Sequence, residues 1–240
     1  MFKFLGVGAQ KSGTTWLYTA LSRHPLINFP QGKEVHFWNN DISDEKIDNY
    51  LSGFLTPSLI EGEITPAYGH LTPNQIEHIY EHLPDIKIIY VMRNPVERAW
   101  SAALMALGRS EMVFNEASDQ WFIDHFTSAG SLSRGDYQQS LMNWVNVYSA
   151  ENVLPLIFED MVLDPEKSIK KTLEHLELGA PDVEMMTDWG LERKIFSGSG
   201  DKIRPQLSFF LKSIYREKII NLENYLKMDL SLEWGGWWNE

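Results

Sequence analysis

The apolar positions of the chain form short continuous runs separated by longer segments of helical spacing. Three runs predict buried strands, namely Lys3 to Gly8, Ile86 to Met92 and Val153 to Phe158. A strand of a parallel sheet is covered on both faces and therefore reads as a continuous apolar run. Ile60 to Ile64 is a shorter candidate for a fourth strand, and the segment from Lys33 to Trp38 is predicted to be partly extended.

Capping residues mark where the predicted helices begin. Thr72, followed by Pro73 and by Gln75, predicts a helix that ends near Leu83, because these residues form an N-terminal capping box with proline in the first turn. Five further helices are predicted, at Ser12 to Arg23, Pro95 to Leu107, Asp136 to Tyr148, Asp164 to Leu176 and Gln206 to Lys227. Residues 109–133 are predicted to be partly helical and residues 179–204 to be mostly loop.

Strands that alternate with capped helices predict an α/β fold. We expect a P-loop-like three-layer sandwich, in which a central parallel sheet is covered by helices on both faces and binds its ligand at the carboxyl ends of the strands. The chain has 240 residues, of which 43% are hydrophobic and 22% are charged. These values fit one domain that spans residues 1–240.

The composition narrows the function. The chain has no cysteine, so it has no disulfide and no thiol chemistry. With 21 Lys and Arg against 33 Asp and Glu, its net charge of −12 disfavours nucleic acid and anionic membranes as partners. No apolar window is long enough for a membrane span. The start MFKFLGVGA reads as a first strand and is too short for a signal peptide, so we expect a cytoplasmic enzyme.

The segment GVGAQKSGTTWL lies where the first predicted strand meets the first predicted helix. Its glycines Gly8 and Gly13 keep the spacing of the phosphate-binding pattern G-x-x-x-x-G-K-[ST]. The lysine that this pattern places after the second glycine is missing, and Lys11 stands inside the loop instead. Backbone amides and a helix N-terminus in this arrangement predict an anion site. The ammonium of Lys11 would contact a different part of the bound anion than the lysine of the usual pattern does.

A magnesium-dependent nucleotide kinase or triphosphatase is one reading of this loop. Thr15 would then hold the magnesium ion, and Thr14 would add a hydroxyl donor. The strand that ends at Met92 is followed by Arg93, however, and carries no acidic residue to complete the metal site. This reading is weakened and stays open as an alternative.

A second phosphate site is indicated at the end of the same strand. Arg93 comes directly before the cap of the next helix, and Ser101 lies about two turns down that helix, on the face of the cap. A guanidinium binds phosphate in a fork, and a hydroxyl on a neighbouring turn completes such a site. Together with the loop, these residues predict a ligand with two separate anionic groups.

Two segments resemble a known family. QKSGTTWL, followed by VMRNPVERAWSAAL, is similar to the two cofactor signatures of the sulfotransferases, which use 3′-phosphoadenosine 5′-phosphosulfate (PAPS). The resemblance implies that the donor's 3′-phosphate is held by Arg93 and Ser101. It implies that the loop end of the donor is held by Lys11, Ser12, Gly13, Thr14, Thr15 and Trp16.

Within that family, the chain is closest in pattern to the glycan enzymes, such as those that act on heparan sulfate. GKEVHFW, residues 32–38, resembles the segment that carries their catalytic glutamate, and EITPAY, residues 63–68, resembles a substrate-side segment. GSGDKIRP resembles loosely their late phosphate loop and implies a cofactor contact for Lys202. The chain differs from them in lacking a membrane helix and in having Ile64 where several of them have lysine.

The resemblance implies a sulfuryl transfer by in-line displacement, in which positioning and electrostatics supply most of the catalysis. Lys11 is assigned to stabilise the leaving oxygen. A base must take the acceptor proton, and Glu34 is our choice, with His36 as the rival. Residues i and i+2 of a strand share a face, so we expect both side chains to point into the cleft. The acceptor is a hydroxyl or amine of a sugar, lipid or small metabolite, and no metal is expected.

The remaining histidines give no spacing that suggests a metal, and those at 78 and 82 look like the polar face of a helix. The tryptophans at 234, 237 and 238 either stack on a ligand or anchor the core. A non-catalytic nucleotide-binding module is a further alternative. It predicts binding of adenosine 3′,5′-bisphosphate (PAP) without turnover, whereas the kinase alternative predicts magnesium-dependent binding of ATP.

Overall fold

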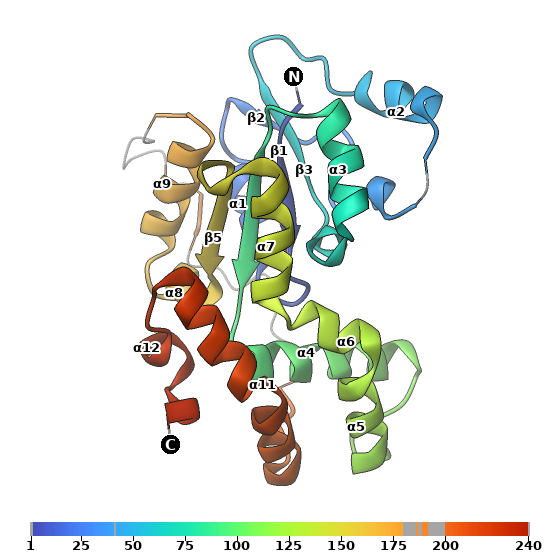
Figure 1. Cartoon of the computed structure of the whole chain (residues 1–240), viewed down its shortest axis with the longest axis vertical. Coiled ribbons are helices and arrows are strands. Elements are labelled where there is room, and N and C mark those ends of the chain that lie inside the picture. The colour runs from blue at the N-terminus through green and yellow to red at the C-terminus, as the bar shows by residue number, and fades with distance from the viewer. Residues whose placement is uncertain (1, 41, 180–185, 187–188, 192–199, 240) are drawn as a thin grey trace.

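The computed structural model describes residues 2–40, 42–179, 186, 189–191 and 200–239. Its centre is a five-stranded parallel sheet with the strand order β2-β3-β1-β4-β5. The strands are β1 (Phe2–Gly8), β2 (Ile27–Asn28), β3 (Ile60–Ile64), β4 (Lys87–Met92) and β5 (Val153–Ile157). All of them run in one direction, so their carboxyl ends share one edge of the sheet (Figure 1).

Helices cover both faces of the sheet (Figure 1). On one face lie α3 (Pro73–His82) and α7 (Tyr137–Tyr148), which contribute to the larger hydrophobic core. On the other lie α1 (Thr14–Leu21) and α9 (Pro165–His175), which contribute to a second core. The predicted fold class, a three-layer α/β sandwich around a parallel sheet, is confirmed.

The other helices connect or extend these layers. They are α2 (Asp44–Leu51), α4 (Pro95–Arg109), α5 (Asp119–Thr127), α6 (Ala129–Arg134), α8 (Phe158–Leu163), α11 (Pro205–Leu226) and α12 (Ser231–Trp234). The 3₁₀ turns are η1 (Phe37–Asn39), η2 (Pro66–His70), η3 (Ala150–Asn152) and η4 (Trp237–Asn239). In Figure 1, α4, α5, α6 and α11 gather beyond the arrowheads of the strands, at the edge where a ligand of this fold binds.

Several predicted boundaries need correction. The first helix begins at Thr14 instead of Ser12, because Gly13 has a left-handed φ of 85° that the helix cannot continue through. Phe158 was placed at the end of the last strand but begins α8, a short helix that the sequence pattern did not reveal. The predicted extended run from Lys33 to Trp38 is reduced to a single bridge between Lys33 and Ile64.

The strand β2 and the helices α2 and α12 also had no sequence prediction. Most of the loop predicted at residues 179–204 lies outside the described residues, and its described end from Gly200 to Arg204 has no regular structure. Among the described residues, none of the helices combines the length and apolarity that a membrane crossing requires.

The tryptophans near the C-terminus anchor the core. Trp234 and Trp238 are buried, and their indole Nε1–H groups donate to the carboxylates of Glu159 at 3.0 Å and Glu223 at 2.9 Å. Trp237 is partly buried, with the ammonium of Lys212 5.3 Å from its ring centroid. The reading of Trp234 and Trp238 as core anchors therefore agrees with their positions.

The capping box that the sequence predicts at the start of α3 is present, and its contribution to stability can be tested. Thr72 accepts from the amide of Gln75 at 3.4 Å, and the side chain of Gln75 accepts from the amide of Thr72 at 3.0 Å. We expect Thr72→Ala to lower the free energy of unfolding by about 1 kcal/mol, since the cap is lost. Thr127→Ala removes an exposed hydroxyl group at the end of α5 and should change the free energy of unfolding by less than about 0.5 kcal/mol. Equal losses in urea denaturation of the two variants would contradict this account.

Candidate active site

Three neighbouring strands end where the candidate site is built. β1 lies between β3 and β4, so the loop after β1, Thr65 after β3 and Arg93 after β4 meet at one edge. The loop is tied to the neighbouring strand by the amide of Ala9, which donates to the carbonyl of Val91 at 2.6 Å. The sheet thus fixes the backbone from which the predicted cofactor residues project.

The loop opens into α1 through Gly13. A side chain at this position would bring its Cβ within 2.5 Å of the ring of Phe158, in addition to the strain of the positive φ. Gly13 is also the N-cap residue of α1, and it has no side chain that could cap the helix. Because the first amides of a helix have no partner within the helix, they are available to an anion here.

Lys11 carries the central charge of the loop. Burial lowers the pKa of its ammonium, and the nearby positive charges of Arg93 and Arg109 lower it further, while Glu34 acts in the opposite direction. Lys11, Arg93 and Arg109 therefore concentrate positive charge at the carboxyl edge of the sheet. Arg109, at the exposed end of α4, was not predicted as a site residue, and no feature of the sequence pattern marked it.

The guanidinium of Arg93 lies against the loop. Its NH1 donates to the carbonyl of Lys11 at 3.3 Å, and its NH2 lies 3.6 Å from a carboxylate oxygen of Glu97. It also stacks over Phe158, with 5.0 Å between Cζ and the ring centroid. Among the described residues, its buried Nε has no hydrogen-bond partner, and neither has the hydroxyl of the fully buried Ser12. These two groups are donors that a bound anion would satisfy.

The other predicted cofactor residues differ in their surroundings. Thr14 is buried at the start of α1, and the carbonyl of the partly buried Thr15 accepts from Thr19 at 2.9 Å. The indole of Trp16 donates to the carbonyl of Leu191 at 2.8 Å and packs on the second core, so its observed contacts are structural.

A hydrogen bond joins the residues that precede Ser101 and Lys202. Ser101 is partly buried on α4, and the indole of the preceding Trp100 donates to the carbonyl of Asp201 at 2.9 Å. Arg204 holds the same segment by donating to Asp119 at 2.5 Å and to nearby carbonyls. The exposed Lys202 therefore follows a residue that is tied to α4, the helix that carries Ser101.

The candidate bases Glu34 and His36 lie on a turn. The expectation that they share a face because they are two residues apart on a strand is therefore wrong. Glu34 and His36 both have left-handed φ values, 61° and 60°. Their side chains nevertheless approach each other, with 4.0 Å between a carboxylate oxygen of Glu34 and Nε2 of His36. Both are about half exposed. Glu34 also pairs with Lys33, and Nδ1 of His36 lies 3.0 Å from the amide oxygen of Asn39.

A second carboxylate, Glu63, precedes Ile64, whose carbonyl accepts from the amide of Glu34, and it was missed as an individual residue. It is fully buried and accepts hydrogen bonds from Thr65 at 2.5 Å, from Tyr68 at 2.6 Å and from Tyr50. Burial raises the pKa of its carboxyl group, against these hydrogen bonds, which lower it. Tyr68 in turn accepts from the amide of Trp38 at 3.3 Å, so the network holds η2, α2 and the Glu34 turn together.

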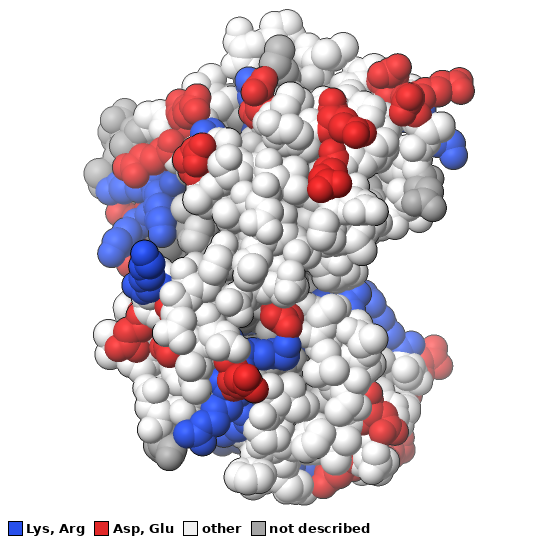
Figure 2. Space-filling view, viewed as in Figure 1, with Lys and Arg blue, Asp and Glu red and all other residues white. Residues whose placement is uncertain are grey.

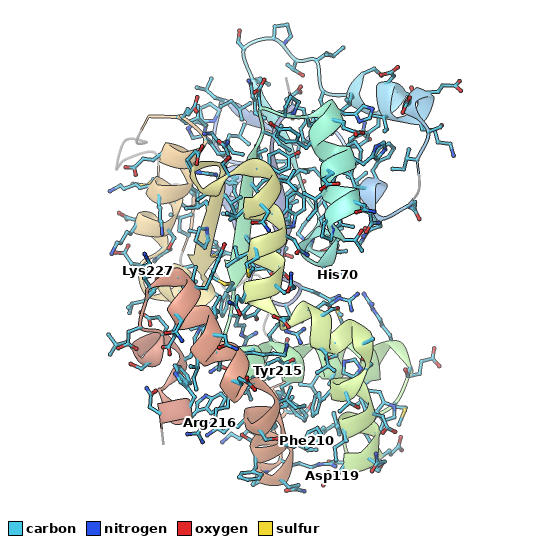
Figure 3. All side chains as sticks on the ribbon, viewed as in Figure 1. His70, Asp119, Phe210, Tyr215, Arg216 and Lys227 are labelled. Atoms are coloured by element: carbon cyan, nitrogen blue, oxygen red, sulfur yellow. The ribbon has the colours of Figure 1, made fainter. Side chains whose placement is uncertain are left out.

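The surface is hollowed beside this edge. Figure 2 shows an indentation between the part of the molecule that carries α3 and the helices α5 and α6, with basic side chains along its lower wall. Figure 3 places His70, the last residue of η2, at the level of this indentation.

Comparison with known proteins identifies the family. The family model described as the sulfotransferase domain matches residues 3–189. The chain therefore belongs to the sulfotransferase family, and the predicted enzyme class is confirmed.

The curated relatives include enzymes of heparan sulfate. The chain is 30% identical over 181 residues to heparan sulfate glucosamine 3-O-sulfotransferase 6 of Mus musculus, a match that covers 72% of this chain and 51% of the relative. It is 28% identical over 188 residues to the bifunctional heparan sulfate N-deacetylase/N-sulfotransferase 2 of the same species, covering 70% of this chain and 21% of the relative. The chain thus spans about half the length of the first relative and about a fifth of the second.

Solved structures agree on the fold. The sulfotransferase from Alicyclobacillus acidocaldarius superposes with a TM-score of 0.73 and 25% identity, covering 100% of this chain and 99% of that one. Mouse sulfotransferase SULT7A1, crystallised with PAP, gives a TM-score of 0.62 at 19% identity, covering 91% of this chain and 84% of that one.

The buried Glu63 network predicts a cost for removing one hydroxyl. Tyr50→Phe leaves the buried carboxylate without one of its donors, so we expect the free energy of unfolding to fall by about 1–3 kcal/mol. Tyr80→Phe, at a largely exposed ring of α3, should change it by less than about 0.5 kcal/mol. Chemical denaturation of both variants measures the difference, and an unchanged Tyr50→Phe protein would show that the network does not support the fold.

Proposed function

We propose that this sulfotransferase takes the sulfuryl group of PAPS and transfers it to a hydroxyl or amine acceptor, which is a sugar, lipid or small metabolite. The observation that carries the proposal is the concentration of positive charge on the loop between β1 and α1. Burial lowers the pKa of the Lys11 ammonium there, and the positive charges of Arg93 and Arg109 lower it further. A bound dianion relieves the repulsion.

The residues present fit such a donor. Unpaired amides at the start of α1, the unpartnered hydroxyl of Ser12 and the ammonium of Lys11 suit a phosphosulfate. The unpartnered Nε of Arg93, with Ser101 on α4 and Lys202 on the adjacent segment, suits a separate phosphate. The mouse neighbour crystallised with PAP has the same fold, which supports this assignment.

The proposed roles follow from charge and position. Bound PAPS would supply a sulfuryl group that is joined to the 5′-phosphate. When this group moves to the acceptor, PAP leaves as an anion through its phosphate oxygen. The ammonium of Lys11 offsets the negative charge that grows on the leaving oxygen. Glu34, exposed at the turn beside the loop, takes the proton of the acceptor, and His36 holds its carboxylate in place or replaces it as the base.

The net charge of the chain and the position of Ile64 bear on the class of acceptor. The relatives named above act on heparan sulfate, whereas this chain carries a net charge of −12. Ile64 is fully buried between the strands, so its side chain does not contact an acceptor. These features favour an acceptor with less charge than heparan sulfate. The cytoplasmic location and the absence of a metal from the transfer reaction stay predictions from the sequence.

Binding of PAP tests the donor site. We expect wild-type protein to bind PAP without magnesium, and Lys11→Ala to weaken the affinity by about tenfold or more, since a charge-assisted hydrogen bond of about 1.5–3 kcal/mol is lost. Calorimetric titration measures both affinities. Lys3→Ala removes the same charge from an exposed residue at the opposite end of β1, and its affinity should equal that of the wild type.

The same titrations at rising pH separate the charge of Lys11 from its packing. The pKa of Lys11 is lowered in the free protein, so its ammonium loses its proton, and PAP loses affinity, at a lower pH than for an exposed lysine. Lys11→Arg keeps its charge and should remove that part of the pH dependence. Magnesium-dependent binding of ATP in place of PAP would favour the kinase alternative instead.

Turnover tests the base. We expect Glu34→Gln to lower kcat by about 10² to 10⁴-fold while PAP affinity stays within about twofold, because proton transfer is lost and the donor site is kept. The measurement uses radiolabelled PAPS with a library of sugars, lipids and small metabolites, followed by kinetics on the accepted compound.

His36→Asn is the matched variant at the rival position. A larger loss of kcat in His36→Asn than in Glu34→Gln would transfer the role of base to His36. PAP binding by the wild type with no sulfated product from any acceptor class would favour the non-catalytic nucleotide-binding module.

A further inference from the structure

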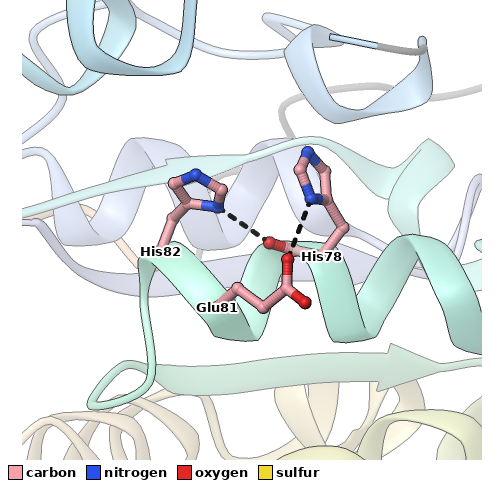
Figure 4. A group of neighbouring side chains, drawn as sticks. All are labelled: His78, Glu81 and His82. Carbon is pink, nitrogen blue, oxygen red and sulfur yellow. Dashed lines mark hydrogen bonds and ion pairs between the residues drawn. The ribbon is translucent and has the colours of Figure 1, made fainter. Parts of the chain in front are cut away.

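A group of metal-ligating side chains lies on α3, outside the site described above. His78, Glu81 and His82 each offer one ligand atom, and these atoms lie within 4.8 Å of one another (Figure 4). In the sequence, the two histidines look like the polar face of a helix. Their spacing of four also places them on neighbouring turns of the same face, where two imidazoles can reach one ion.

The distances are close to those of a coordination shell. Two donors of one tetrahedral zinc ion lie about 3.3 Å apart, since each is about 2.0–2.1 Å from the metal. Nδ1 of His78 lies 3.3 Å from a carboxylate oxygen of Glu81. Nε2 of His82 lies 3.8 Å from a carboxylate oxygen of Asp44, the first residue of α2. Asp44 is close only to His82, so its carboxylate would have to move toward His78 and Glu81 to join them at one ion. Both carboxylates are mostly exposed and free to move.

The ring of His82 is already oriented for metal binding. Its Nδ1–H donates to the backbone carbonyl of His78 at 3.0 Å, as Figure 4 shows. This bond places the proton on Nδ1 and leaves the lone pair of Nε2 directed toward Asp44. Metal-bound histidines commonly donate their second ring N–H in this way, which fixes both tautomer and orientation.

The ring of His78 is held as well. It makes edge-to-face contacts with the ring of His82, at 5.0 Å between centroids, and with the buried Trp38, at 6.4 Å. The cluster thus combines two oriented imidazoles with two carboxylates. This donor set suits zinc, because zinc takes nitrogen and carboxylate oxygen ligands, whereas magnesium and calcium prefer oxygen alone.

We propose that His78, Glu81 and His82 bind a zinc ion on α3, with Asp44 of α2 as the fourth ligand. The ion would join α3 to α2. α2 also carries Tyr50, the donor to Glu63. Zinc therefore stabilises the packing of α2 on the acceptor side of the molecule and is separate from the donor loop.

The experiment is a calorimetric titration of tag-free, full-length protein with zinc chloride after treatment with a chelator. We expect one equivalent to bind, and His82→Ala and His78→Ala each to weaken the affinity by about tenfold or more. Asp44→Asn should weaken it less, since three ligands remain. Thermal unfolding gives a second readout, because zinc that binds the folded state raises the Tm of the wild type and leaves that of the double variant His78→Ala/His82→Ala unchanged.

Matched controls keep the outcome clear. Glu77→Gln changes a charge on the same helix outside the cluster and should leave zinc affinity unchanged. Because the substituted side chains are at most partly buried, circular dichroism should report folded variants. Absence of zinc binding by the wild type, or unchanged affinity and stoichiometry in the double variant, would overturn the proposal. A Tm rise that survives in Asp44→Asn would remove α2 from the site while keeping the three ligands of α3.

Discussion

The close approach of backbones at the carboxyl end of β1 is the constraint on which the site depends. A side chain at Gly8 would place its Cβ 2.6 Å from the ring of Tyr90 and 3.3 Å from the backbone of Gly69. Only glycine lets β4 and η2 lie this close on both sides of the strand end. As a consequence, the loop that follows Gly8, Arg93 after β4 and the segment after β3 all begin within one small area of the sheet edge.

The local charge of this area is positive. The whole chain is strongly acidic, yet the groups that face Lys11 are mainly cationic, namely Arg93 and Arg109, with Glu34 as the opposing carboxylate. Holding these charges together costs stability in the free protein, a cost that is common at functional sites. Binding of an anion would return part of that stability, which couples donor binding to the folding of the loop. Net charge alone is therefore a poor guide to the donor, because local charge has the opposite sign.

Much of the fold could be predicted from the sequence, because it is encoded in local patterns. The continuous apolar runs of β1, β4 and β5 and the cap at Thr72 gave their elements nearly to the residue. The turn at Glu34 and His36 could not be predicted, since left-handed φ values in residues other than glycine leave no periodic signal.

Side-chain roles were harder to predict. The resemblance to the family named the cofactor residues, and those roles remain predictions. Glu63 lies in a segment that the resemblance placed on the substrate side, and only the tertiary structure reveals the hydroxyl groups of Tyr50 and Tyr68 around it. The approach of Asp44 to His82 likewise joins two helices whose contact no local pattern encodes.

The surroundings of Glu63 and Glu34 suit them to different roles, Glu63 to a structural one and Glu34 to that of a base. The oxygens of Glu63 accept from three hydroxyl groups in a buried network, so this carboxylate has little capacity left for a proton from outside. Glu34 is half exposed, paired with Lys33 and near His36. Its amide donates to the carbonyl of Ile64 at 3.0 Å, which ties its backbone to the strand that carries Glu63. The backbone position of Glu34 is thus fixed while its carboxylate stays accessible. A base that must meet an acceptor from solvent needs this combination, and Glu63 lacks it.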